Sequence, residues 1–311
     1  MHPFSIFTLP ALLLGLLFGS FLNVLISRLP RRESIVTPRS HCPQCGTPLR
    51  WYDNVPLLSY VLLRARCRAC KQPIPWRYPA VELAAGLWFF LVAARFASQS
   101  SRLHNFGATG LGSPDLPLLI AAISLAVLGL LLIALIVIDW QHQLLPDALV
   151  FPGILLAFLL TSTQAIFVGP QQDIHLHRRN PLTSPGAVID RGNLLLTGPE
   201  AILGRWLLSV LAAAVILLAV RALYKLLRHR EGMGVGDVKL LALIAAFLGF
   251  WPAILALFAG VLFATLYAVT LLARRRADPL TRLPFGSFLG AGGLLSALLG
   301  PQIISWYKTL L

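Results

Sequence analysis

Two aspartates stand at the edges of long apolar segments, where a charged side chain is costly. Asp139 follows "LLIALIVI", and Asp237 lies in "GMGVGDVKLL", just before a second apolar run. Ionisable residues at such positions are rare, so each is a candidate for function by default. Two carboxylates close together cannot both ionise cheaply, so one keeps a proton while the other can take one from water. The pair therefore predicts the chemistry of an aspartic protease.

Gly234 and Gly236 precede the second aspartate. Glycine has no side chain, so these positions would let the backbone approach a substrate strand and would let Asp237 be re-aimed. An alternative is that the glycine-rich stretch only begins a helix, with Asp237 as its cap. Other proteolytic chemistries lack their residues, because the sequence contains neither an HExxH zinc pair nor a GxSxG serine motif.

All four cysteines lie in one polar segment, as Cys42-x2-Cys45 and Cys67-x2-Cys70 with 21 residues between the two pairs. Paired CxxC motifs can close a tetrahedron of thiolates around zinc, so the spacing predicts a zinc site. The alternative is four unliganded thiols; disulfides are disfavoured in a reducing cytoplasm. The segment is too short and polar to build a large core, so bound metal would contribute directly to its folding. His41 is adjacent to a cysteine but is not needed as a ligand.

The composition places these residues in a membrane protein. Of the 311 residues, 57% are hydrophobic and 12% are charged, far more apolar than an ordinary globular domain. The net charge of +14 does not indicate a nucleic-acid partner, because the basic residues cluster beside apolar spans without interleaved aromatic residues. Membrane lipid is the expected surrounding, and nucleic acid is excluded as a partner.

Apolar runs long enough to cross a membrane predict an all-α polytopic protein with about eight transmembrane helices and a small cytosolic zinc-binding loop domain. The expected spans are 5–27, 80–97, 116–138, 148–168, 203–223, 239–250, 253–273 and 286–307. We expect "FWP" at 250–252 to separate the sixth span, which is short, from the seventh. The first span lacks basic residues before its apolar core, so it predicts a retained helix and not a cleaved signal peptide.

The distribution of basic residues sets the orientation. With the N-terminus outside, 19 of the 26 Lys and Arg residues lie in inside loops, as the positive-inside rule requires. This predicts that both termini are outside and that both aspartates lie at the inner boundary. We expect an outside insertion near 169–202 without assigned chemistry, and a solvated His175-Leu176-His177 within it. Asp147, after Pro146, is expected to cap the fourth span.

The chain resembles the bacterial type IV prepilin peptidases, which are bifunctional leader peptidases and N-methyltransferases that also serve type II secretion. The resemblance rests on three stretches that stand in the family's order. These are 19–83 with the four cysteines, "IDWQHQLLPDALV" at 138–150, and "EGMGVGDVKLLALIAAFLG" at 231–249.

The resemblance implies a role for each matching residue. Asp139 and Asp237 match the family's catalytic aspartates, the latter in a Gly-x-Gly-Asp motif, and the four cysteines match its zinc ligands. Such enzymes cut prepilins and pseudopilins after a glycine on the cytoplasmic side, and they methylate the new N-terminus from S-adenosylmethionine. The implied location is the bacterial inner membrane. The 98 positions between the two aspartates exceed the family's usual separation, and the insertion near 169–202 accounts for this.

The expected organisation has three parts. Residues 1–27 form the first transmembrane helix, residues 28–80 a zinc-binding and methyltransferase region, and residues 81–311 the peptidase core. No glycine-rich nucleotide loop follows a strand, so the methyl-donor site is implied by resemblance alone and no residue is assigned to it. The sequence assigns no oligomeric state.

Two other classes of protein would explain some of these features. A transporter also places carboxylates near broken helices, but the spans show no internal repeat and a zinc segment has no evident role in transport. A membrane scaffold would use the cysteine segment to bind partners but would leave Asp139 and Asp237 unexplained.

Overall fold

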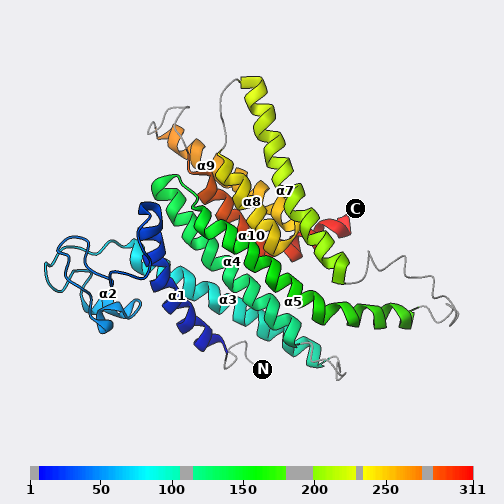
Figure 1. Cartoon of the computed structure of the whole chain (residues 1–311), viewed down its shortest axis with the longest axis horizontal. Coiled ribbons are helices and arrows are strands. Elements are labelled where there is room, and N and C mark those ends of the chain that lie inside the picture. Colours follow the sequence, from blue (N-terminus) through cyan, green and yellow to red (C-terminus); the bar gives the residue numbers. More distant parts are fainter. Residues whose placement is uncertain (1–6, 106–114, 180–198, 229–233, 275–282, 311) are drawn as a thin grey trace.

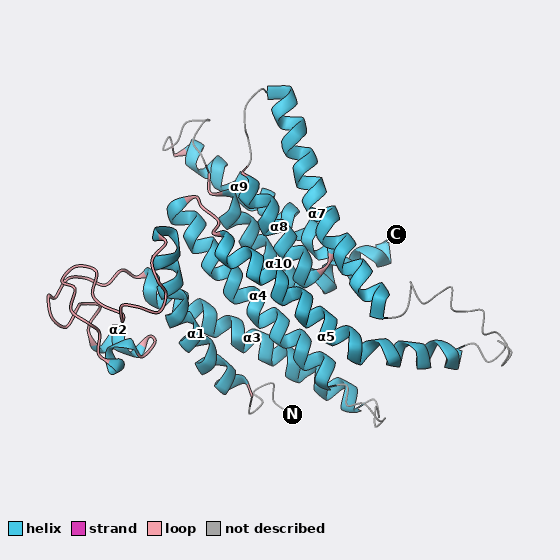
Figure 2. Cartoon of the chain, in the orientation of Figure 1, coloured by secondary structure: helices cyan, strands magenta, loops and turns pink. Residues whose placement is uncertain are grey.

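The computed structural model describes residues 7–105, 115–179, 199–228, 234–274 and 283–310. These residues form helices joined by loops, and within them the only β pairing is two isolated bridges in the cysteine segment. Figure 2 shows that most of the loop structure belongs to that one segment. The helices are α1 (Thr8–Arg28), η1 (Leu29–Arg31), η2 (Trp51–Asn54), α2 (Leu58–Leu62), α3 (Arg77–Asn105), α4 (Asp115–His142), α5 (Asp147–Arg179), α7 (Pro199–Arg228), α8 (Val235–Leu248), α9 (Phe250–Ala273) and α10 (Phe285–Leu310).

Seven of the described helices are long and apolar enough to cross a membrane, namely α1, α3, α4, α5, α7, α9 and α10. The remaining expected span, the short sixth one at 239–250, corresponds to α8, which has only 14 residues. The predicted fold class is thus confirmed. One expectation changes, because α5 continues to Arg179 and α7 begins at Pro199, so both ends of the expected 169–202 loop are helical. Residues 180–198 lie outside the described residues, whereas the stretch His175-Leu176-His177 belongs to the C-terminal part of α5.

Helix α4 lies at the centre of the bundle, in contact with α1, α3, α5, α8 and α10 (Figure 1). Its inward side chains Leu128, Leu132, Leu135 and Ile138 are fully buried. Apolar residues elsewhere are widely exposed on the outer helices, which suits a lipid environment. Asp139, one residue after Ile138, is therefore carried into the interior by the helix at the centre of the bundle.

Helix α8 is buried on nearly every side by its neighbours. Leu240, Leu241, Leu243 and Ile244 are all inaccessible, as expected of a helix that is apolar around its whole circumference. It ends at Gly249, whose φ of 86° lies in a region that favours glycine. The observed break between α8 and α9 is therefore at Gly249, one residue before the expected break at "FWP". Pro252 lies in the first turn of α9, where proline is tolerated.

Small residues allow two pairs of helices to approach closely. A Cβ added at Gly15 or Gly19 of α1 would lie 2.6 Å from backbone atoms of α3, and one added at Gly292 of α10 would lie 2.3 Å from the carbonyl oxygen of Ala256 in α9. Such contacts replace the hydrophobic effect as the basis of helix association in lipid. The close packing of α9 against α10 fixes the position of the α10 N-terminus, which matters for the site.

The cysteine segment between α1 and α3 lies to one side of the bundle, next to the end of α1 (Figure 1). Arg77, the first residue of α3 and directly after this segment, donates a hydrogen bond to the side chain of Gln141 near the end of α4. The segment is thus tied to the same end of the bundle as Asp139, although it does not cover the helices there.

Candidate functional site

Asp139 lies in the last turn of α4 and is buried, with 6% of its surface exposed. Its Oδ2 atom accepts two hydrogen bonds from Ser287 in the first turn of α10, one from the backbone N–H at 2.6 Å and one from the hydroxyl at 2.9 Å. The hydroxyl oxygen is also 3.0 Å from the carbonyl oxygen of Ile136, so its single proton can serve either acceptor. The carboxylate of α4 is therefore bonded to the beginning of α10.

Asp237 lies in the first turn of α8 and is also buried, with 8% exposed. The structure brings it close enough to Asp139 for the two charges to interact, and the backbone N–H of Gly234 interacts with its carboxylate. Both side chains retain some exposed surface, so water can reach the pair. Two buried carboxylates that share one site can divide the roles of proton acceptor and proton donor.

The two glycines of the motif have different surroundings. A Cβ added at Gly236 would lie 3.0 Å from Cδ1 of Leu145, whereas one added at Gly234 would meet only ordinary contacts, the nearest being Oδ2 of Asp237 at 3.7 Å. Gly234 has a φ of −72°, so its backbone does not require glycine. Gly236 thus permits close packing within the chain, between the start of α8 and the segment that follows α4.

Gly286 and Ser287 belong to the surroundings of the site, although their sequence motif alone does not identify them as site residues. A Cβ added at Gly286 would lie 3.0 Å from both Cγ and Oδ2 of Asp139. A signal was present in "LPFGSF" at 283–288, which begins the last expected span and places a hydroxyl in its first turn. The motif does not reveal which residue the hydroxyl contacts, because nothing in the sequence relates this turn to Asp139.

Three aromatic rings brace the helices beside the site. Trp140, the neighbour of Asp139, has its ring 5.5 Å from that of Tyr267 in α9 and 6.1 Å from that of Phe288 in α10. The rings of Tyr267 and Phe288 are 5.3 Å apart. Edge-to-face contacts at these distances are favourable, so they stabilise the arrangement of α4, α9 and α10 around the carboxylate.

Asp147 is separate from the pair, although it lies at the same end of the bundle. It occupies the first turn of α5, and its Oδ1 is 2.7 Å from Nζ of Lys239 in α8. The Asp147 side chain is 56% exposed, in contrast to the buried pair. The ion pair gives Asp147 a structural contact between α5 and α8.

The structure also brings the four cysteines together. All four Sγ atoms lie within 4.8 Å of one another, and the Sγ atoms of Cys42 and Cys70 are 3.9 Å apart. In a tetrahedral site with Zn–S distances of about 2.3 Å, neighbouring sulfurs are about 3.8 Å apart, so the cluster fits zinc. Each CxxC forms the same short turn, with the backbone N–H of Cys42 bonded to Thr47 and that of Cys67 bonded to Gln72.

The thiols influence one another's protonation. The Sγ of Cys45 is 3.3 Å from Oγ1 of Thr47, and this contact, helped by the Thr47 backbone, lowers the pKa of the Cys45 thiol to about 6. At Cys70 the backbone of Gln72 favours the thiolate, but burial and the neighbouring sulfurs outweigh it and raise the pKa of this thiol to about 11. Four thiolates this close repel one another, and a dication at their centre would remove that repulsion.

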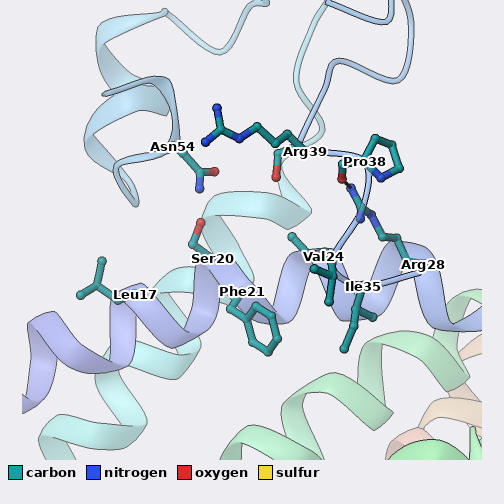
Figure 3. Close-up of a pocket in the computed structure, with 11 residues that line it drawn as sticks. Leu17, Ser20, Phe21, Val24, Arg28, Ile35, Pro38, Arg39 and Asn54 are labelled. Atoms are coloured by element: carbon teal, nitrogen blue, oxygen red, sulfur yellow. Dashed lines mark hydrogen bonds between the residues drawn. The ribbon is translucent and has the colours of Figure 1, made fainter. Parts of the chain in front are cut away.

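A cavity of about 360 Å³ lies between α1 and the cysteine segment (Figure 3). The hydroxyl of Ser20 on α1 and the carboxamide of Asn54 point toward each other across it, and the side chain of Arg39 extends above them. Arg28 forms part of its wall and donates to the carbonyl oxygens of Ser34 at 2.8 Å and Pro38 at 2.7 Å. The cavity thus has polar groups at its rim, and its size is that of a small-molecule site.

The fold and these sites define an all-α integral membrane protein that carries a buried carboxylate pair and a four-cysteine cluster at one end of its bundle. Two family models match the chain. The Bacterial Peptidase A24 N-terminal domain matches residues 13–96, which include the four cysteines, and the Type IV leader peptidase family matches residues 179–269, which include Asp237. Asp139 lies between the two matched regions.

Curated relatives extend the match over nearly the whole chain. The chain is 32% identical to a prepilin leader peptidase/N-methyltransferase of Pseudomonas putida, over 97% of this chain and 94% of the relative. It is 32% identical to the Pseudomonas aeruginosa protein of the same name over 98% and 94%, and 38% identical to that of Klebsiella pneumoniae over 77% and 84%. No solved structure matches. The chain belongs to the type IV leader peptidase family.

Proposed function

We propose that the chain cleaves the leader peptide of type IV prepilins and type II secretion pseudopilins, and then N-methylates the new N-terminal residue. The observation that carries the proposal is the burial of Asp139 and Asp237 within range of each other's charge, in a chain of this family. Cleavage falls after a glycine on the cytoplasmic side. The peptidase core comprises residues 81–311, and Asp139 and Asp237 are its catalytic residues.

The pair performs hydrolysis by moving protons at both ends of the reaction. One carboxylate accepts a proton from a water molecule as the water oxygen bonds to the scissile carbonyl carbon, while the protonated partner donates to the carbonyl oxygen. The tetrahedral intermediate then collapses: the aspartate that took the proton from water gives it to the leaving nitrogen as the C–N bond breaks. The other aspartate takes back a proton from a hydroxyl of the intermediate as the carbonyl re-forms, and this restores the pair. Burial favours this chemistry, because proton transfer between enclosed groups does not compete with bulk water.

The orientation follows from the basic residues. The protein is a bacterial inner-membrane protein with both termini outside, so that the cysteine segment and both aspartates face the cytoplasm. The substrate's apolar helix lies in the membrane beside the bundle, and its leader reaches the aspartates from the cytoplasmic side. This placement agrees with the position of the pair near one end of the helices, in the last turn of α4 and the first turn of α8.

We assign zinc to Cys42, Cys45, Cys67 and Cys70, as a structural metal without an open coordination position. Zinc would hold the two CxxC turns together in a segment whose own apolar core is small. Residues 28–80 then form a zinc-stabilised region that also carries methyl transfer.

For the methyl donor, S-adenosylmethionine, we assign the cavity beside α1. The donor supplies an electrophilic methyl group to the free amine of the processed pilin. Arg39 would pair with the donor's carboxylate, since its guanidinium has no partner among the described residues. Asn54 and Ser20 would form hydrogen bonds to the donor's polar atoms, and Phe21 and Val24 would contact its apolar parts.

Cleavage is tested with detergent-purified protein and a prepilin, with the new N-terminus read by mass spectrometry. Wild type cuts after the leader glycine, whereas Asp139→Asn and Asp237→Asn each reduce the rate by about a hundredfold or more, because an amide cannot transfer the proton. Matching elution profiles and melting temperatures for all three proteins provide the control. Cleavage at the wild-type rate by either variant would exclude the aspartate mechanism.

A further inference from the structure

We propose that the first turn of α10 is a positioning element of the aspartate site, in which Ser287 holds the Asp139 carboxylate and Gly286 gives it room. The inference rests on the proposed peptidase function and adds two residues to it. These residues are 147 and 148 positions away from Asp139 in the sequence, and they enter the site only through the packing of α10 against α4.

Both donors of Ser287 bond the same oxygen of Asp139. The backbone N–H and the hydroxyl lie 2.6 and 2.9 Å from Oδ2, and Ser287 is only 4% exposed. Among the described residues, both hydrogen bonds to this carboxylate are made at Oδ2, so Oδ1 remains available to Asp237 or to an attacking water. A carboxylate held at one oxygen by two donors loses its rotational freedom, and this fixes the direction in which the other oxygen acts.

The N–H of Ser287 is suited to this task by its place in the helix. It lies in the first turn of α10, where the N–H is shared between the carbonyl oxygen of Pro284 at 3.1 Å and the nearer Oδ2 of Asp139 at 2.6 Å. A negative charge at a helix N-terminus is also favourable. The carboxylate of α4 therefore serves as an N-terminal partner of α10, and the same contact orients it.

Gly286 makes the contact possible. Any side chain there would place a Cβ 3.0 Å from Cγ and Oδ2 of Asp139 and 3.1 Å from Cδ1 of Leu145. Neither neighbour can withdraw freely, because Asp139 is bonded to Ser287 and Leu145 also packs against Gly236. The requirement at 286 is steric, since the close approach and not a special backbone angle excludes larger residues.

The rings of Phe288, Trp140 and Tyr267 support the arrangement from outside. Phe288 follows Ser287, and Trp140 follows Asp139, so the ring contact joins the same two turns as the hydrogen bonds. The turn is thus held to α4 both by the hydrogen bonds to Asp139 and by the ring contact of Phe288 with Trp140.

The kinetic test uses Ser287→Ala, which removes the hydroxyl and leaves the backbone donor. We expect kcat for prepilin cleavage to fall about three- to tenfold, as befits one hydrogen bond to a charged group, with KM within about twofold of wild type. The matched control is Ser296→Ala in the same helix, which removes a buried hydroxyl bonded to the carbonyl oxygen of Pro252 at 2.6 Å. This control keeps the wild-type kcat. A wild-type kcat for Ser287→Ala, or an equal loss in both variants, would overturn the positioning role.

Gly286→Ala tests the steric requirement. We expect it to lose most of the cleavage activity, because the new methyl group displaces the Asp139 carboxylate. Gly204→Ala is the control, since a Cβ at this position in α7 would meet nothing within 4 Å. Full activity of Gly286→Ala would contradict the proposal.

A stability measurement separates this inference from the proposed function. Ser287→Ala should lower the melting temperature when Asp139 is present and have a smaller effect in an Asp139→Ala background, because only the carbonyl oxygen of Ile136 then remains as an acceptor for the hydroxyl. This cycle needs no substrate. If the wild-type protein fails to cleave prepilin, the proposed function is wrong. The coupling between the Ser287 and Asp139 substitutions in melting temperature still shows whether Ser287 holds Asp139. Additive effects of the two substitutions would sink the positioning contact itself.

Discussion

At the scale of single residues, three aspartates at one end of the bundle differ through their surroundings. Asp139 and Asp237 are enclosed and interact with each other, whereas Asp147 is half exposed and paired with Lys239. Enclosure makes a carboxylate responsive to a neighbouring charge, and exposure lets water screen it. We therefore propose that the same side chain serves proton transfer at two positions, whereas at the third it forms an ion pair.

This contrast predicts that Asp147→Asn retains most of the cleavage activity. The change removes an exposed ion pair, worth about 0–1 kcal/mol, and asparagine is as well accepted at a helix start as aspartate. Initial rates of prepilin cleavage, compared with those of Asp139→Asn, provide the measurement. Lys239→Gln, which breaks the same pair from its other side, should match Asp147→Asn. If Asp147→Asn were as inactive as Asp139→Asn, the division between the pair and Asp147 would be wrong.

At the scale of elements, the two CxxC turns have the same backbone design. In each, the first cysteine accepts a bond from the residue four positions on, and that residue, Gly46 or Lys71, has a positive φ. Two equivalent turns facing each other supply four sulfurs from a segment without a described helix longer than five residues. The fold of this segment therefore depends on an interaction that holds the two CxxC turns together.

We predict that a zinc ion holds the two CxxC turns together. Freshly purified protein should contain about one zinc per chain, and Cys42→Ser should lower the zinc content and expose residues 28–80 to limited proteolysis. His41→Ala is the matched control, because His41 is adjacent to Cys42 and its Nδ1 interacts with the carbonyl oxygen of Arg39. It should keep the metal. Elemental analysis that finds no zinc in wild type would contradict the assignment.

At the scale of the whole molecule, the two proposed reactions occupy different places. The aspartate pair is enclosed by α4, α8 and α10, whereas the cavity assigned to the methyl donor is lined by α1 and the cysteine segment and includes neither aspartate. An amine that attacks a sulfonium methyl needs orientation and the loss of a proton, but no paired carboxylates. The processed pilin would thus pass from one site to the other along the same face of the protein.

We therefore expect Asp139→Asn to methylate a pilin that has already been cut. The assay supplies processed, unmethylated pilin with labelled S-adenosylmethionine and measures the label on its first residue. Arg39→Ala is the reciprocal variant, with reduced methylation and unchanged cleavage. Equal loss of methylation in a folded, zinc-loaded Asp139→Asn protein would mean that both reactions share one site.

The sequence by itself determined the membrane class, the approximate spans and the residues capable of chemistry. Apolar length and the distribution of basic residues are local properties, because each span must satisfy the bilayer separately. The cysteine spacing is equally local, since each CxxC turn is closed by bonds within a few residues. Prediction succeeded for α1 and α8, whose limits differ from the expected ones by a few residues.

Only the tertiary structure decided which helix ends meet. The contact between Asp139 and Ser287 spans 148 positions and depends on how α10 packs against α4, which no local pattern encodes. The roles of Gly286 and Gly236 likewise come from distances to side chains of other elements. Local sequence patterns indicate what chemistry a residue can perform. Its partners depend on the packing of the bundle, because contacts between distant segments depend on the shapes of all the intervening helices.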